Sequence, residues 1–108
     1  MMSNIYRHGD ILLLPVDKMP GKTKAVRRQH GRLVLAEGEV TGHAHVIEDQ
    51  AAKLVTADQA AELYLLVHGT EPVSLTHEEH RTILVPPGQY RVMRQVEYTP
   101  EELRAVAD

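Results

Sequence analysis

The sequence predicts an all-β fold, a small barrel or sandwich of about eight short strands with a short C-terminal helix. Two observations lead to this expectation. Short apolar runs rich in leucine, valine and isoleucine recur along the chain, and clusters of glycine, proline and polar residues separate them. The 108 residues contain neither an internal repeat nor a linker-like stretch. We therefore expect one domain, residues 1–108, able to bury its own core.

In the first half of the chain, strands are expected at residues 10–16, 25–29, 32–36 and 43–48. Pro15 has no N–H to donate to a sheet, so it indicates a strand end or an edge strand. Pro20-Gly21 predicts a loop over residues 17–23. His30-Gly31 between two runs is a two-residue hairpin signal, and the glycines of residues 37–42 indicate a turn that can hold a β-bulge.

In the second half, strands are expected at residues 53–56, 62–68, 73–76, 81–85 and 90–98. The stretch ADQAAEL has helical propensity, but the apolar run LYLLV that overlaps it favours a buried strand. Pro86-Pro87-Gly88-Gln89 is a strong turn signal. After it the residues alternate, so that one face of the last strand carries Tyr90, Val92, Arg94, Val96 and Tyr98.

The end of the chain has the signature of a helix start. Thr99 is a good N-cap, Pro100 suits the first helical position, and Glu102 follows the cap by three residues. The sequence therefore predicts a helix at about residues 99–107. A helix this short has to pack on the sheet to be stable.

Composition excludes several classes of protein. The chain has no cysteine, so disulfides and thiolate metal sites are ruled out, and a metal could be held only by His, Asp, Glu or backbone oxygen. The opening MMSNIYRHGD lacks the apolar run of a signal peptide, and the stretches ILLLPV and LYLLV are far shorter than a membrane span. We therefore expect a cytoplasmic protein with no membrane contact.

The charge is unevenly distributed although the formal net charge is only −3. Half of all lysines and arginines fall in residues 18–32. Such a basic segment can attract phosphate or RNA, but it has no aromatic residues on which bases could stack. A solvated hairpin with ordinary surface lysines is therefore the favoured interpretation, with RNA kept as a partner that this segment could bind.

The seven histidines are the main functional signal. His43 and His45 are two apart, so on a strand both rings leave the same face. His77 and His80 are three apart and could reach one place from a tight turn. Imidazoles grouped in this way, completed by a carboxylate or water, suit a divalent transition metal: Zn, Fe, Mn or Ni. The other three histidines, His8, His30 and His68, each precede a glycine and are expected to be exposed at strand ends.

Two of these patterns together resemble the cupin family of small β-barrels. His43-Ala44-His45 with Glu48 or Asp49 is similar to the first cupin motif, and Pro86-Pro87-Gly88 to the turn of the second. The second-motif histidine is replaced here by Arg91. The resemblance implies a metal held by His43 and His45 with Glu48 or Asp49, and with His77 or His80 taking the place of the missing histidine.

Three functions follow from these features. The first is a metal-dependent, cupin-like enzyme acting on a small polar or phosphate-containing substrate. In it the metal is bound by His43, His45 and His80, and a fourth ligand or general base comes from Glu48, Asp49, His77 or Glu78. Arg91 or Arg94 pairs with a substrate anion. The second is a metal-free ribonuclease or phosphodiesterase that uses two histidines as acid and base. The third is a non-catalytic module, since exposed strand edges are typical of homo-oligomers.

Overall fold

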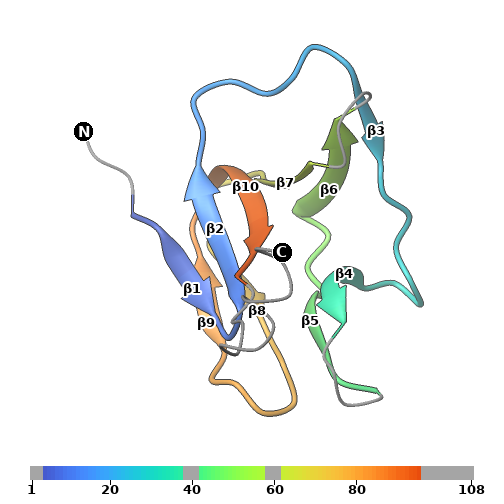
Figure 1. Cartoon of the computed structure of the whole chain (residues 1–108), viewed down its shortest axis with the longest axis vertical. Coiled ribbons are helices and arrows are strands. Elements are labelled where there is room, and N and C mark those ends of the chain that lie inside the picture. The colour runs from blue at the N-terminus through green and yellow to red at the C-terminus, as the bar shows by residue number, and fades with distance from the viewer. Residues whose placement is uncertain (1–3, 38–41, 58–61, 96–108) are drawn as a thin grey trace, which may run out of the picture.

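The computed structural model describes residues 4–37, 42–57 and 62–95, and within these ranges the chain is entirely β (Figure 1). The strands are β1 (Tyr6–His8), β2 (Ile11–Pro15), β3 (Thr23–Ala25), β4 (Leu33–Glu37), β5 (Ala44–Ile47), β6 (Ala52–Ala57), β7 (Leu63–Val67), β8 (Val73–Leu75), β9 (Ile83–Val85) and β10 (Gly88–Arg94). These ranges accordingly hold no helix of the length and apolar character needed to cross a bilayer.

Six strands form one antiparallel sheet in the order β1-β2-β10-β7-β6-β3, and β4-β5 and β8-β9 form two further antiparallel pairs. Val46 and Thr76 exchange two backbone hydrogen bonds of 2.9 Å, which join β5 to the end of β8. The edge strands β1 and β3 do not pair with each other. The described strands therefore form three sheets that do not close into a barrel.

A single apolar core lies between the sheet and the two strand pairs. Its fully buried members come from both layers, and they include Leu13, Leu54, Leu65, Leu75, Ile47 and Val85. Without phenylalanine or tryptophan, branched aliphatic side chains fill this core, and the largest side chain in it is Tyr90. Tyr90 donates its hydroxyl hydrogen to the Pro86 carbonyl at 2.8 Å, which ties the Pro86-Pro87 turn to β10.

Two tight turns shape the part of the chain that leads to the histidines. Gly9 and Asp10 are the only residues between β1 and β2, and the φ of +62° at Gly9 fits a type II′ hairpin turn. At the predicted His30-Gly31 turn both residues have positive φ, 54° and 79°, as a type I′ turn requires. Gln29 and Arg32 close this turn with backbone hydrogen bonds of 2.8 and 3.0 Å.

The all-β class and most strand positions are confirmed, but several details were wrong or missed. Of the strand expected at residues 25–29, only Ala25 is in a strand, as the last residue of β3. Strand β3 pairs with β6 and not with β4. Arg28 explains this departure, because its guanidinium donates hydrogen bonds to the carbonyls of Asp49 and Ala52 and holds the segment against the β5–β6 turn. Strand β1 was not predicted. The expected helix at 99–107, and most of the turn at 37–42, lie outside the described residues.

Candidate functional site

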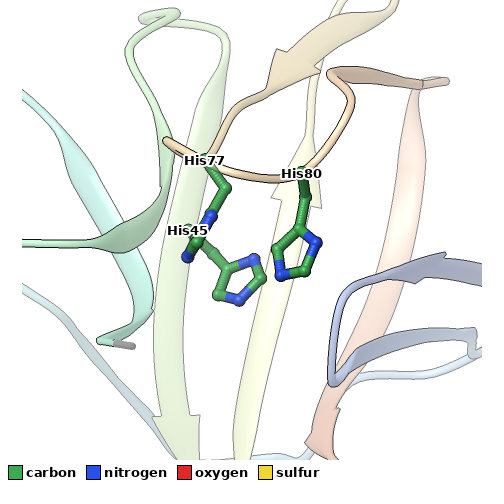
Figure 2. A group of neighbouring side chains, drawn as sticks. All are labelled: His45, His77 and His80. Carbon is green, nitrogen blue, oxygen red and sulfur yellow. The ribbon is translucent and has the colours of Figure 1, made fainter. Parts of the chain in front are cut away.

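Four histidines from distant parts of the chain meet next to the β1–β2 turn. His8 ends β1, His45 lies in β5, and His77 and His80 belong to the loop between β8 and β9. Figure 2 shows the rings of His45, His77 and His80 grouped below that loop. Their ring centroids are 4.5 Å apart for His45–His77, 4.4 Å for His77–His80 and 5.6 Å for His45–His80.

This spacing suits three imidazoles bound to one ion. A ring nitrogen at about 2.0–2.1 Å from a metal puts the ring centroid about 3.2 Å from it, so ligands at angles of about 90–110° have centroids about 4.5–5.2 Å apart. Of the three observed separations, one lies at the lower limit of that range, one is 0.1 Å below it, and the third exceeds it by 0.4 Å. One nitrogen from each ring lies within 4.8 Å of the other two.

His8 fixes which nitrogen of His45 carries a proton. The Arg81 carbonyl can only accept, so His8 Nε2, 2.9 Å away, is the protonated nitrogen of a neutral ring. His8 Nδ1 then accepts the hydrogen bond of 2.8 Å from His45 Nδ1. Neutral His45 therefore has its free electron pair on Nε2, the nitrogen that is available to a metal.

Both rings are neutral at neutral pH because of where they lie. Each is only 2% exposed. Burial, and after it the neighbouring imidazoles His77 and His8, lower the pKa of His45 to about 4. Burial also lowers the pKa of His8, although its hydrogen bond to the Arg81 carbonyl opposes the change. Metal ligation requires neutral imidazole, and this environment supplies it.

The carboxylate of Asp10 lies against the buried pair of rings. Its Oδ1 lies 3.2 Å from His45 Nε2, and its Oδ2 accepts a hydrogen bond of 2.7 Å from Arg94 Nε. Partial burial raises the pKa of this carboxyl, but the hydrogen bond and charge of Arg94 outweigh that effect and the net pKa is lowered. Asp10 is therefore ionised where it faces His45.

Gly9 leaves room for the rings. A Cβ at this position would lie 2.6 Å from His80 Nε2 and 3.0 Å from His45 Cε1, both closer than ordinary contact allows. The backbone at Gly9 also has the positive φ that glycine adopts without strain. The same residue thus forms the turn and lets two imidazoles approach the backbone.

His77 is held by its own loop. Its Nδ1 accepts a hydrogen bond of 3.0 Å from the Glu79 amide, so in the neutral ring the proton is on Nε2. Binding a metal through either nitrogen has to break this bond. The loss is about 0.5–1.5 kcal/mol, small beside the roughly 10–16 kcal/mol of structural zinc binding.

A second group lies next to the first and shares His77 with it. His43, His77 and Glu78 also bring one ligand atom each within 4.8 Å of one another. Glu78 accepts a hydrogen bond of 2.8 Å from the Ala44 amide, which lowers the pKa of its carboxyl. His43 Nδ1 is buried without a hydrogen-bond partner and lies 3.6 Å from a Glu79 oxygen.

The structure brings together some of the predicted site residues and not others. His45 and His80 meet, with His77 as the third imidazole in place of His43. Glu48 is exposed and lies instead on a separate pocket with Asp49, Ser74 and Thr76. Arg91 is 3.7 Å from Glu62, in an ion pair that contains no histidine, whereas Arg94 reaches the site through Asp10.

The sequence patterns did not indicate that His8 and Asp10 lie at this cluster. His8 was expected to be exposed beside a strand-ending glycine, and this is wrong, because it is buried in the cluster. His30 and His68 are exposed as expected. The available signal was the stretch His8-Gly9-Asp10-Ile11: Gly-Asp fits the two central positions of a type II′ hairpin turn, which places His8 directly opposite Ile11.

The chain belongs to a family described as a domain of unknown function, DUF8820, whose model matches residues 7–95. This range contains His8, Asp10, the three clustered imidazoles and Arg94. No curated protein and no solved structure gives a significant match to the chain. The site itself is therefore the basis for assigning a function.

Proposed function

We propose that this protein is a metal-dependent enzyme that binds a divalent transition metal through His45, His77 and His80 and acts on a small polar substrate. The convergence of the three rings, with centroids 4.4–5.6 Å apart, carries the proposal. Imidazole ligands suit Zn, Fe, Mn or Ni. The proposal keeps the metal chemistry that the cupin resemblance implies and replaces His43 by His77 in the ligand set.

The exposure of the ligands favours a catalytic over a structural metal. His45 is buried and holds one side of the site, whereas His77 is half-buried and His80 is exposed. A closed structural zinc site has four protein ligands, and a catalytic site leaves a position for water or substrate. A bound metal would lower the pKa of such a water to about 7 or polarise a substrate carbonyl.

Metal content of the untagged protein tests the proposal. We expect one equivalent of transition metal per chain after loading, and loss of binding in His45→Ala, His77→Ala and His80→Ala. His30→Ala and His68→Ala are matched controls, since both residues are exposed and lie outside the cluster. A folded protein that takes up no metal, or the same uptake in all five variants, would contradict it.

One observation favours metal-free acid–base chemistry as a second candidate. The hydrogen bond of 2.8 Å between His8 and His45 joins two neutral imidazoles that could pass a proton. The support for an RNA substrate is weaker, because Lys18 and Lys22 lie on the β2–β3 connection, which leaves the end of β2 opposite the Gly9-Asp10 turn (Figure 1). RNA cleavage that persists in chelator and is lost in His45→Ala would favour this candidate.

A further inference from the structure

We propose that the metal ion has a second, outer position on this chain, formed by His43, His77 and Glu78. This inference rests on the proposed function, since the outer position shares His77 with the site that also contains His45 and His80, called the inner position below. The inner position binds the ion more tightly, and the outer one is its alternative. The outer position gives a role to His43 and Glu78, which the sequence singled out and the inner position does not use.

The outer group meets the same distance condition as the inner one. In each group, one ligand atom per residue lies within 4.8 Å of the other two. The ring centroids of His43 and His77 are 5.7 Å apart, close to the 5.6 Å between His45 and His80. Atoms bound to one ion at about 2.0–2.2 Å lie about 2.8–3.6 Å apart, so the outer group closes around an ion with changes of at most about 2 Å in these distances. The exposed side chain of Glu78 has room for such a movement.

One hydrogen bond ties together the two segments that carry the outer group. The Ala44 amide donates to Glu78 Oε1 at 2.8 Å, which joins the residue after His43 to the residue after His77. An ionised carboxylate accepts at two oxygens, so Glu78 can keep this bond and still bind an ion. The outer group is therefore held in place by the backbone at the start of β5.

His43 contributes a ring nitrogen that lacks a partner in the described part of the chain. Its Nδ1 is buried and makes no hydrogen bond, and the nearby Glu79 oxygen is 3.6 Å away. Buried polar atoms without a partner are uncommon in folded proteins. A metal ion bound at this nitrogen supplies the missing partner.

The shared His77 makes the two positions alternatives. A neutral imidazole binds a metal through one nitrogen and keeps its hydrogen on the other, so His77 serves one ion at a time. One ion per chain is therefore expected, in either position. The inner position is the tighter one, because His45 is buried and oriented by His8, whereas the exposed Glu78 loses conformational freedom on binding.

Disabling the inner position should reveal the outer one. In calorimetric titration with Zn²⁺, we expect His80→Ala to bind one equivalent at least about tenfold more weakly than the wild type. Metal held this weakly is lost on desalting, so it is seen by titration and not in the metal content of the purified variant. Adding His43→Ala or Glu78→Gln to His80→Ala should weaken binding by at least about another tenfold. Glu79→Gln in the same background is the matched control and should leave the affinity unchanged, since Glu79 belongs to neither group.

The outcomes separate this inference from the function on which it rests. If the wild type binds Zn²⁺ but His80→Ala binds none, or binds it equally well with and without His43→Ala and Glu78→Gln, the inference is overturned and the inner site stands. If His43→Ala abolishes binding and His80→Ala leaves it at the wild-type level, the outer position stands and the inner one is overturned. If the wild type binds no metal, both are overturned. His80→Gln replaces His80→Ala in every comparison if the alanine variant does not fold.

Discussion

His8 is the residue whose role differs most from its appearance in the sequence. Its ring lies near all three proposed ligands, but it hydrogen-bonds to His45, and its hydrogen bonds of 2.8 and 2.9 Å set the tautomer of that ring. Groups that orient a ligating histidine typically affect metal affinity by 10–100-fold without touching the ion. His8 is thus a positioning residue in the proposed centre.

Removing the acceptor at position 8 tests this role. In His8→Phe the Nδ1 hydrogen of His45 is buried without a partner, which costs about 1–3 kcal/mol of unfolding free energy, and Zn²⁺ affinity is expected to fall by about 10–100-fold. In His8→Asn the amide oxygen can replace Nδ1 as acceptor and restore part of the affinity. Calorimetric titration with Zn²⁺ measures the affinity, and ¹⁵N NMR of His45 reports its tautomer, which a purely structural role would leave unchanged.

Gly9 offers a second test with a matched control in the same chain. Gly9→Ala and Gly31→Ala both place a side chain at positive φ, 62° and 79°, so each is expected to lose about 1–2 kcal/mol of stability from backbone strain. Only the Gly9 Cβ meets a site residue, His80 Nε2 at 2.6 Å, whereas nothing lies within 4 Å at Gly31. Metal affinity should therefore fall in Gly9→Ala alone. Equal affinity in the two variants would show that His80 is not needed near Gly9.

At the scale of elements, the loop between β8 and β9 carries two of the proposed ligands. Its start is fixed, because Thr76 exchanges two hydrogen bonds with Val46, whereas His77 is held by the Glu79 amide at 3.0 Å. Sequence spacing indicated that His77 and His80 could meet in a tight turn, and they do. It could not show that β5 would lie next to this loop, because that contact depends on pairing across 30 residues.

Metal binding is expected to change this loop locally. Since either nitrogen of His77 becomes available only when its bond to the Glu79 amide breaks, that amide should exchange with solvent faster in the Zn²⁺ form than in the metal-free form. The Val46 amide, bonded to the Thr76 carbonyl at 2.9 Å, is the internal control and should be unchanged or better protected. Hydrogen exchange followed by NMR measures both. An amide of Glu79 that stays equally protected would exclude His77 as a ligand.

For the molecule as a whole, the sequence predicted local features well and distant contacts poorly. Turn chemistry placed His30-Gly31 and the Pro86-Pro87 turn correctly, because both depend on neighbouring residues. Glu48 was expected near His45 because the two are close in sequence, whereas the carboxylate that lies 3.2 Å from His45 Nε2 is that of Asp10, which reaches it through the β1–β2 turn. The burial of His8 was not predicted because its hydrogen-bond partners, His45 and Arg81, are distant from it in sequence.

The buried neutral histidines make the stability of the whole fold depend on pH. The pKa of His45 is lowered from 6.5 to about 4, and the pKa of His8 is lowered as well. Above pH 6.5 the two rings are neutral in the folded and in the unfolded chain, so they do not make the unfolding free energy depend on pH. Between about pH 6.5 and 4 the unfolded chain takes up protons that the folded chain refuses, so His45 alone reduces the unfolding free energy by up to about 1.4 kcal/mol per pH unit.

Urea unfolding of the metal-free protein at pH 7, 6 and 5 should therefore show falling stability, with most of the loss below pH 6.5. The variant His45→Gln lacks this titrating group, so its unfolding free energy should depend less on pH than that of the wild type, although the variant is less stable at pH 7. His68→Gln changes an exposed histidine and should keep the wild-type slope. Added Zn²⁺ should raise the unfolding free energy at pH 7, because it binds the folded chain. A flat wild-type profile between pH 7 and 5 would mean that His8 and His45 are not buried as neutral rings.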